Sequence, residues 1–192
     1  MILDPYNHNN ILFDGDDELF KKHVSQSNFY FEYGVGKSTK WVIENTKSKI
    51  IAVDSDQKWI NNVCNKNSFD ERVKFICVDL GKLTDWGRPI SYNKRDNFIS
   101  YMNSVWAFDI KADVILIDGR FRVACFLYSL LNAKKGSFIF FDDYNNRPWY
   151  HIVEEIVPLH STCGRQAIFQ IPEFYNKKLA QSLFNNFIYV FD

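Results

Sequence analysis

The feature that most constrains the fold is an apolar run that ends in a glycine turn. Phe29–Tyr33 is followed at once by Gly34-Val35-Gly36, and a second apolar run, Lys49–Asp54, ends in an acid 20 positions after Gly34. Glycine lets the backbone approach a ligand closely, and a helix between two apolar runs makes the two strands parallel. The pattern therefore predicts a ligand site at the carboxyl ends of two parallel strands.

One interpretation of the turn is a Rossmann-type nucleotide site. Such a turn needs an acid and closely spaced glycines, which Glu32, Gly34 and Gly36 provide, with the small Ser38 in place of a third glycine. Asp54 then lies where a Rossmann unit binds ribose hydroxyls. We favour this interpretation because all of these residues occur in the required order.

The alternative interpretation is the phosphate-binding loop of an NTPase. That loop needs a glycine five positions before Gly36, where this chain has Phe31. Lys37 would then contact phosphates, and Asp113–Asp118 would serve as the second acidic strand. The missing glycine disfavours this interpretation without removing it.

Short apolar runs alternate with helix-length amphipathic segments along the whole chain. This alternation predicts an α/β protein with a doubly wound, mostly parallel, seven-stranded Rossmann-like sheet and helices on both faces. The predicted strands are Asn28–Tyr33, Lys49–Asp54, Val73–Val78, Asp113–Asp118, Ser137–Phe141, Gln166–Ile171 and Phe187–Phe191. The predicted helices are Thr39–Thr46, Gln57–Asn65, Phe121–Asn132, Trp149–Ile156 and Glu173–Phe184.

Composition favours one domain that spans residues 1–192. With 46% hydrophobic residues the chain can bury a substantial core, and no linker divides it. Lys+Arg and Asp+Glu both number 23, so no net charge attracts nucleic acid or an anionic membrane surface. Four cysteines without C-x-x-C spacing favour reduced, mostly buried thiols. No signal peptide or membrane helix is visible, so we expect a cytoplasmic protein.

At this point the chain resembles the class I S-adenosylmethionine (SAM)-dependent methyltransferases. The matching motifs are Glu32-Tyr-Gly-Val-Gly, Val53-Asp54-Ser-Asp56, Val78-Asp79 and Ile117-Asp118-Gly119. The resemblance covers the chain from about residue 28 to its end, and it implies a last strand that inserts antiparallel. It implies that SAM is the cofactor, that Asp54 holds the ribose and that Gly34 and Gly36 pass under the methionine part. The remaining implied cofactor residues are Glu32, Ser38, Asp79 or Leu80 at the adenine, and Asp118.

Two segments are longer than plain connections. Residues 1–27 are predicted to form an N-terminal helical extension, with an acidic start at Asp14–Glu18 and a basic turn at Leu19–His23. Residues 81–111 carry many aromatic side chains, which argues against disorder. We expect this second segment to form a substrate-side insertion, or else to pack its aromatics under a surface helix.

Three acids follow two neighbouring predicted strands, namely Asp118, Asp142 and Asp143. Their setting resembles the metal-dependent O-methyltransferases of the catechol and macrolide-sugar types, in which such acids hold one Mg²⁺ ion. A hard cation with oxygen ligands would orient an acceptor hydroxyl and lower its pKa. The chain departs from the catechol type because Arg120 and Arg122 stand where that type has a lysine. The alternative is that the acids cap helices or pair with Arg120, Arg122 and Arg147.

The segment after these acids supplies further candidates. His151 is the candidate general base, because arginine stays protonated and the unperturbed pKa of histidine is near neutrality. A structural role is the alternative for this lone histidine. Tyr150 and the three arginines Arg120, Arg122 and Arg147 are candidate substrate contacts, since guanidinium groups bind carboxylates and phosphates. Cys125 lies in an apolar helix and is expected in the core.

These observations predict a SAM-dependent methyltransferase that methylates oxygen on a small polar or acidic acceptor, such as a sugar-like or phosphorylated metabolite. No nucleic acid or membrane partner is expected, and the sequence leaves open whether the chain forms a homodimer. Three alternatives remain: a P-loop NTPase, a catalytically silent SAM- or nucleotide-binding module, and a nicotinamide dehydrogenase. A dehydrogenase is the least favoured of these, because a clear G-x-G-x-x-G is lacking.

Overall fold

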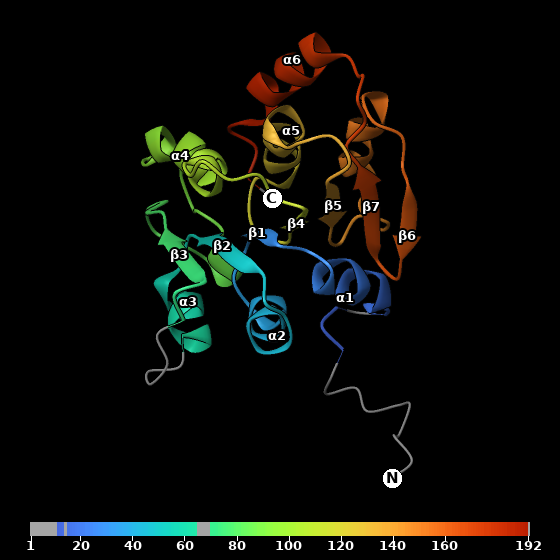
Figure 1. Ribbon diagram of the computed structural model, residues 1–192. Helices are drawn as coiled ribbons and strands as arrows, with labels where there is room; N and C mark the ends of the chain where they lie inside the picture. The colour runs from blue at the N-terminus through green and yellow to red at the C-terminus, as the bar shows by residue number, and fades with distance from the viewer. Residues whose placement is uncertain (1–10, 14, 65–69, 192) are drawn as a thin grey trace.

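The computed structural model describes residues 11–13, 15–64 and 70–191 and contains a seven-stranded sheet (Figure 1). The strand order is β3-β2-β1-β4-β5-β7-β6. The first five strands are parallel, whereas β7 runs antiparallel to β5 and to β6. The predicted doubly wound, mostly parallel sheet is therefore confirmed, including its antiparallel inserted strand. The strands are β1 Phe29–Tyr33, β2 Lys49–Asp54, β3 Val73–Cys77, β4 Val114–Ile117, β5 Phe138–Phe141, β6 Ser161–Cys163 and β7 Gln166–Gln170.

Helices cover both faces of the sheet (Figure 1). One face packs against α1 Glu18–Ser25, α2 Lys37–Asn45 and α3 Gln57–Val63, and the other against α4 Phe98–Asn103, α5 Arg122–Asn132 and α6 Lys177–Phe187. Short 3-10 helices are η2 Asp85–Gly87, η3 Arg95–Asn97, η4 Ser104–Trp106 and η5 Pro148–Glu155. Within the described ranges, no helix is long and apolar enough to cross a bilayer.

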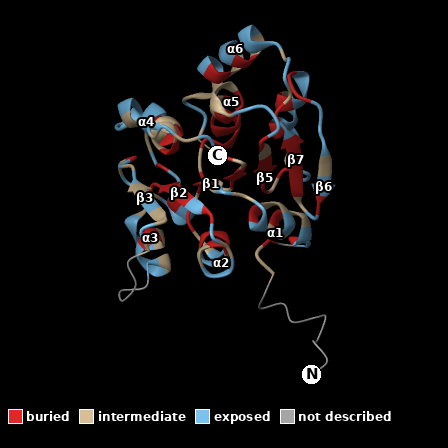
Figure 2. Cartoon of the chain, in the orientation of Figure 1, coloured by how far each residue is buried: buried red, intermediate tan, exposed pale blue. Residues whose placement is uncertain are grey.

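The central strands are apolar on both sides because helices bury both faces (Figure 2). In β1, Phe31 and Tyr33 join the core under α4 to α6, while Tyr30 joins the core over α1 to α3. In β2, Ile51 joins the core under α4 to α6, and Ile50 joins the core over α1 to α3. The central strands are therefore continuous apolar runs in the sequence. Their last residues lie at the carboxyl edge of the sheet.

The last predicted strand, Phe187–Phe191, is wrong. Helix α6 continues to Phe187, and the rings of Tyr189 and Phe191 pack against Phe98 of α4. Strand propensity in such a run reflects the fit of its side chains to a packed surface, and here a helix offers that surface. The seventh strand is instead β6, which forms a hairpin with β7.

Smaller differences concern helix type and cysteine burial. The predicted helix Trp149–Ile156 is the 3-10 helix η5, and α6 starts at Lys177, after Asn176 caps the backbone N–H of Leu179. Cys125 and Cys163 are buried as expected, but Cys64 and Cys77 are exposed. Cys77 is exposed because β3 is an edge strand.

The two long segments both pack on the sheet. From the N-terminal segment, Phe20 of α1 contacts Phe140, and Phe13 contacts Phe20, although residues 1–10 and 14 of this segment lie outside the described residues. In the segment 81–111, α4 buries Phe98 and Tyr101, whereas Trp86 is 74% exposed. Part of the second segment therefore packs its aromatic side chains in the core, and part of it faces solvent. Its place on the substrate side stays a prediction.

Candidate functional site

The glycine turn joins the ends of β1, β2 and β4. Gly34 has a φ of +94°, and a Cβ built there would lie 2.7 Å from the carbonyl oxygen of Asp118. Its N–H donates to the carbonyl oxygen of Val53 at 2.8 Å. Gly36 is the N-cap residue of α2, and a Cβ built there would meet no heavy atom within 4 Å. Gly34 is thus required by the fold itself, whereas Gly36 borders open space.

Asp54 ties the second strand to this turn. One carboxylate oxygen accepts from the backbone N–H of Val35 and the other from that of Asp56, both at 2.8 Å. The side chain is nearly buried, and this burial raises its pKa, against the lowering effect of these hydrogen bonds. Each carboxylate oxygen has a second lone pair, so the group can accept further hydrogen bonds from a ligand.

Glu32 and Ser38 lie beneath the turn and bond to each other. Glu32 is fully buried, and the hydroxyl of Ser38 donates to its Oε1. Burial raises the pKa of Glu32 to about 8, while the hydrogen bonds from Ser38 and Thr39 act in the opposite direction. These two predicted cofactor residues therefore connect β1 to the start of α2.

Asp79 and Leu80 occupy different environments. Leu80 is 1% exposed and belongs to the core. Asp79 is exposed, pairs with Lys94 at 3.0 Å and accepts from the N–H of Gly81, and the hydrogen bond from Lys94 lowers its pKa. Asp79 alone of this pair presents its side chain to solvent.

Asp118, Asp142 and Asp143 come together as predicted at the ends of β4 and β5. Their potential ligand oxygens all lie within 4.8 Å of one another. Two parallel neighbouring strands, with Ile117 opposite Phe141, bring the acids to the same edge. Burial raises the pKa of Asp118, opposed by Arg122 and reinforced by Asp142 and Asp143.

Three arginines contact these acids. The nearly buried Arg122 lies 3.1 Å from both Asp118 and Asp143, as measured between guanidinium nitrogens and carboxylate oxygens. Arg147 lies 2.9 Å from Asp143. Arg165 lies 2.5 Å from Asp142 and 3.2 Å from Asp143. Three guanidinium groups thus balance three carboxylates, as the alternative interpretation expected, except that Arg165 takes the place expected for Arg120.

Arg165 was missed by sequence reasoning. It follows Gly164 in the turn between β6 and β7, 23 positions from Asp142, and no motif marks it. Arg120, which the sequence suggested, donates its backbone N–H to the hydroxyl of Tyr101 at 3.3 Å. Only the geometry of the hairpin between β6 and β7 shows that Arg165 contacts these acids.

Tyr150 and His151 lie on η5. Tyr150 is fully buried, and its hydroxyl lies 3.1 Å from Nη1 of Arg147, so it supports this arginine from within the core. His151 is exposed; its ring stacks on Tyr144 at 4.7 Å, and Nε2 lies 3.3 Å from the carbonyl oxygen of Tyr144. The contacts of the His151 ring described here are thus with Tyr144.

Tyr101 is a second residue that sequence reasoning did not select. It is buried in α4, and its hydroxyl would lie 2.2 Å from a Cβ at Gly119. Gly119 is therefore required both by the approach of this ring and by the backbone at the end of β1, since a Cβ would also lie 2.8 Å from the nitrogen of Gly34 and 2.9 Å from the carbonyl carbon of Tyr33. The aromatic content of residues 81–111 was the available signal, but it did not distinguish Tyr101 from its neighbours.

Comparisons with known proteins agree with this fold. No family model and no curated protein sequence matches the chain. A methyltransferase-like protein from Silicibacter pomeroyi superposes with a TM-score of 0.77 at 27% identity, covering 89% of this chain and 92% of its own. A putative O-methyltransferase from Klebsiella pneumoniae (TM-score 0.51, 14% identity) covers 80% of this chain and 77% of its own, and shows the fold alone. The structural neighbours are class I SAM-dependent methyltransferases, so the resemblance inferred from the motifs is confirmed at the level of the fold.

Proposed function

We propose that this chain is a SAM-dependent methyltransferase that methylates oxygen on a small polar or acidic acceptor. The observation that carries the proposal is the link between Asp54 and the glycine turn at the carboxyl edge of the sheet. The hydrogen bond from the N–H of Val35 to Asp54 fixes an acid beside the open backbone of Gly36. Open α/β sheets bind ligands at this edge. The likeness to a methyltransferase-like protein at 27% identity supports the same activity.

In this proposal Asp54 accepts from the ribose hydroxyls of SAM, and Gly34 and Gly36 leave room for the methionine part. Glu32 and Ser38 act from below by holding the turn. Asp118 borders the turn through its carbonyl oxygen and faces the acceptor side with its carboxylate. The cofactor and the acceptor would therefore meet between the ends of β1 and β4.

The chemical step is an in-line displacement. The bond between the methyl carbon and the sulfonium sulfur breaks as the acceptor oxygen forms a bond to that carbon, and the proton of the acceptor hydroxyl leaves to a base. Alignment supplies much of the rate in such a reaction. His151 is our candidate base because it is exposed beside Tyr144 and close in sequence to Arg147, and because arginine cannot accept the proton.

The arginines beside the three acids affect whether these acids can hold a metal ion. Arg147 and Arg165 have side chains that are 31% and 27% exposed, whereas that of Arg122 is 4% exposed. Arg147 and Arg165 are partly exposed and together carry two positive charges, the same charge as one divalent cation. The two arginines or one such cation can therefore neutralise the acids beside Arg122. Asp118, Asp142 and Asp143 have the donor chemistry for Mg²⁺, which would orient and acidify an acceptor hydroxyl. Arg147 and Arg165 would then be available to an acidic acceptor.

Calorimetric titration of the purified protein with SAM and with its demethylated product, S-adenosylhomocysteine (SAH), tests the proposal. We expect binding of both, unchanged in Lys37→Ala, because Lys37 begins α2 and carries no phosphate role in this proposal. ATP with magnesium, titrated against the same two proteins, tests the NTPase alternative. Tight ATP binding that Lys37→Ala abolishes, or no binding of SAM and SAH, would overturn the proposed function.

A further inference from the structure

The turn between β6 and β7 carries Arg165, and the loop after β5 holds one side of this turn. The backbone N–H groups of Tyr144 and Asn145 donate to the carbonyl oxygen of Arg165 at 3.0 and 3.2 Å. The side-chain amide of Asn145 donates to the carbonyl oxygen of Gly164 at 2.8 Å. The guanidinium group of Arg165 extends to Asp142, with Nε 3.1 Å from Oδ1. The backbone of the turn therefore sets where this guanidinium group lies.

The other side of the turn packs against the N-terminal segment. Gly15 has a φ of +106°, and a Cβ built there would lie 3.2 Å from the Cα atom of Gly164 and 4.0 Å from the backbone nitrogen of Arg165. At the end of β6, the Sγ atom of Cys163 donates to the carbonyl oxygen of Asp16 at 3.5 Å. Glycine allows both this positive φ and this close approach. Gly15 and Asp16 therefore lie directly against the backbone of the turn.

The N-terminal segment is itself anchored to the core. Phe13 packs edge-to-face on Phe20 of α1, with ring centroids 5.2 Å apart, and both rings are buried. The nearly buried carboxylate of Asp17 accepts from the backbone N–H of Leu12 at 2.9 Å. This hydrogen bond closes a loop of the chain that contains Gly15. Two buried rings and one hydrogen bond thus fix the position of Gly15.

These contacts link the N-terminal segment to a buried acid. Asp142 is fully buried, and a buried carboxylate is costly unless a partner neutralises it. The side chain of Arg165 is 27% exposed, so its tip is only partly enclosed by packing. A shift of the turn by about 1 Å would take Nε of Arg165 out of hydrogen-bond range of Asp142. The contact of Gly15 with Gly164 therefore affects the charge balance at Asp142.

We propose that residues 15–17 are a positioning element of the acceptor side, and that Gly15 is the positioning residue. By packing against Gly164 they hold the turn so that Arg165 neutralises Asp142. The inference rests on the proposed function only in assigning these acids to the acceptor side. It gives the N-terminal extension a role in the site: the extension sets the charge that an acceptor or a cation meets at Asp142 and Asp143.

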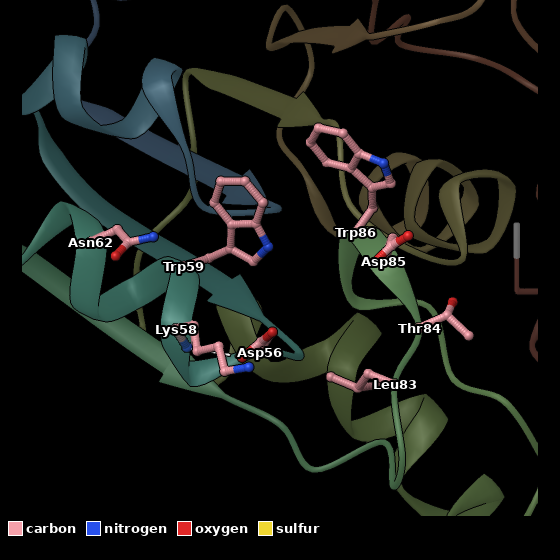
Figure 3. A pocket seen from close by; sticks show the side chains of 8 residues that line it. All are labelled: Asp56, Lys58, Trp59, Asn62, Leu83, Thr84, Asp85 and Trp86. Atoms are coloured by element: carbon pink, nitrogen blue, oxygen red, sulfur yellow. Dashed lines mark hydrogen bonds between the residues drawn. The ribbon is translucent and has the colours of Figure 1, made fainter.

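The cofactor side of the same sheet edge provides an independent control. A pocket of about 620 Å³ opens near the carboxyl end of β2 (Figure 3). It lies between α3 and the hairpin of residues 82–90, where the rings of Trp59 and Trp86 stack with centroids 5.8 Å apart. In the strand order, β1 and β4 separate β2 from β5. A change at Gly15 should therefore leave SAH binding at Asp54 unchanged.

The test follows the Nε–H group of Arg165 by nuclear magnetic resonance in the full chain. This signal is assigned because it is missing from the spectrum of Arg165→Gln. Gly15→Ala should raise the hydrogen-exchange rate of this group by about tenfold or more, which corresponds to about 1.4 kcal/mol. A methyl group against Gly164 and a strained backbone at positive φ both push the turn away.

Gly136→Ala is the matched control. Gly136 also has a positive φ, +84°, but a Cβ there would meet no heavy atom within 4 Å. This variant carries the backbone strain without the contact, so it should keep the Arg165 exchange rate within about twofold of the wild type. Asp17→Ala loosens the loop without adding an atom and should raise the rate as Gly15→Ala does. Asp17→Asn keeps an acceptor for the N–H of Leu12 and should restore much of the wild-type rate.

The outcomes separate the two proposals. If Gly15→Ala lowers the melting temperature as Gly136→Ala does and leaves the Arg165 exchange rate within about twofold of the wild type, Gly15 has only a structural role and the positioning proposal is overturned. A loss of SAH affinity in Gly15→Ala would also overturn it, because the effect would then reach the cofactor side. If the wild type binds neither SAM nor SAH, the proposed function fails, while the Arg165 signal still tests the positioning.

Circular dichroism establishes that each variant is folded. Should Gly15→Ala unfold, the wild type and the Asp17 variants decide. A nuclear Overhauser contact between the α protons of Gly15 and Gly164 must then be present in the wild type, and Asp17→Ala must raise the Arg165 exchange rate above that of Asp17→Asn. Absence of either result overturns the positioning proposal.

Discussion

Arg165 gives the sharpest test of the charge balance at the ends of β4 and β5. Arg165→Gln removes the guanidinium group that contacts both carboxylate oxygens of Asp142, a side chain that is fully buried. It also removes the contact with Asp143 at 3.2 Å. Of the three arginines that contact these acids in the described part of the chain, Arg122 and Arg147 would then remain, and the buried carboxylate of Asp142 would lose the guanidinium group that contacts it.

The magnitude follows from burial. Breaking a buried ion pair by removing one partner costs about 3–5 kcal/mol. Because Arg165 is 27% exposed, solvent already screens part of the pair, and we expect a loss of about 2–4 kcal/mol. For a chain of this length that corresponds to about 2–4 °C of melting temperature per kcal/mol. Asp142→Asn in the same variant should restore part of the loss, because it removes the stranded charge.

The assay is urea denaturation followed by circular dichroism, with Arg95→Gln as a matched control at an exposed arginine. A divalent cation should stabilise Arg165→Gln more than the wild type, since it supplies the missing positive charge; sodium chloride at equal ionic strength controls for screening. Calorimetry with Mn²⁺ gives an independent measure of binding. A loss below about 0.5 kcal/mol, the range of ordinary surface substitutions, would refute the reasoning. So would equal cation effects on the variant and the wild type.

The remaining predictions concern the turn and its supports. Asp54→Ala should weaken SAM binding by about 1.5–3 kcal/mol, measured by calorimetry, because the ribose hydroxyls lose their acceptor; affinity within twofold of the wild type would count against that role. Glu32 has a folded pKa of about 8, above its unfolded value, so it stabilises the fold below pH 4.5 and this contribution is lost as the pH rises towards 8. The free energy of unfolding should fall by up to about 1.4 kcal/mol per pH unit across that window and less steeply in Glu32→Gln, as denaturation at several pH values would show; equal slopes would contradict this. Gly119→Ala should destabilise the protein, since the new Cβ meets the hydroxyl of Tyr101 and the backbone of Tyr33 and Gly34. Tyr101→Phe should relieve only the part of that loss that comes from the hydroxyl, as a thermal melt would show; no relief would mean that the backbone contacts account for the whole loss.

Much of the fold was predictable from local pattern. Buried parallel strands are apolar on both faces, so β1 and β2 are visible as continuous runs with a glycine turn or an acid at the end. The short β6 is not visible, because its three residues Ser161–Cys163 carry no apolar periodicity. The run Phe187–Phe191 resembles a strand in composition, yet its rings pack against α4. Local pattern could not distinguish a strand in a sheet from a tail that packs on a helix.

The candidate site was likewise predictable only in part from the sequence. The acids Asp118 and Asp142 were predicted to meet, because both directly follow strands whose carboxyl ends lie at one edge. The pairing of Asp142 with Arg165 and of Trp59 with Trp86 was not predicted, because each joins segments that are separated in sequence. Such contacts depend on how a hairpin folds back on the sheet.

The sequence by itself determined the order of β1 to β5 and β7 along the chain and the residue types at the carboxyl ends of the first strands, including Gly34 and Asp54. Strand pattern and turn chemistry are local, so they can be read from neighbouring residues. Only the tertiary structure decided which charges neutralise one another and which rings border the pocket. Arg165 reaches the acids, and Trp86 reaches Trp59, through side chains that extend from hairpin turns. The position of such a turn depends on the packing of the whole sheet, and no short segment of sequence contains that information.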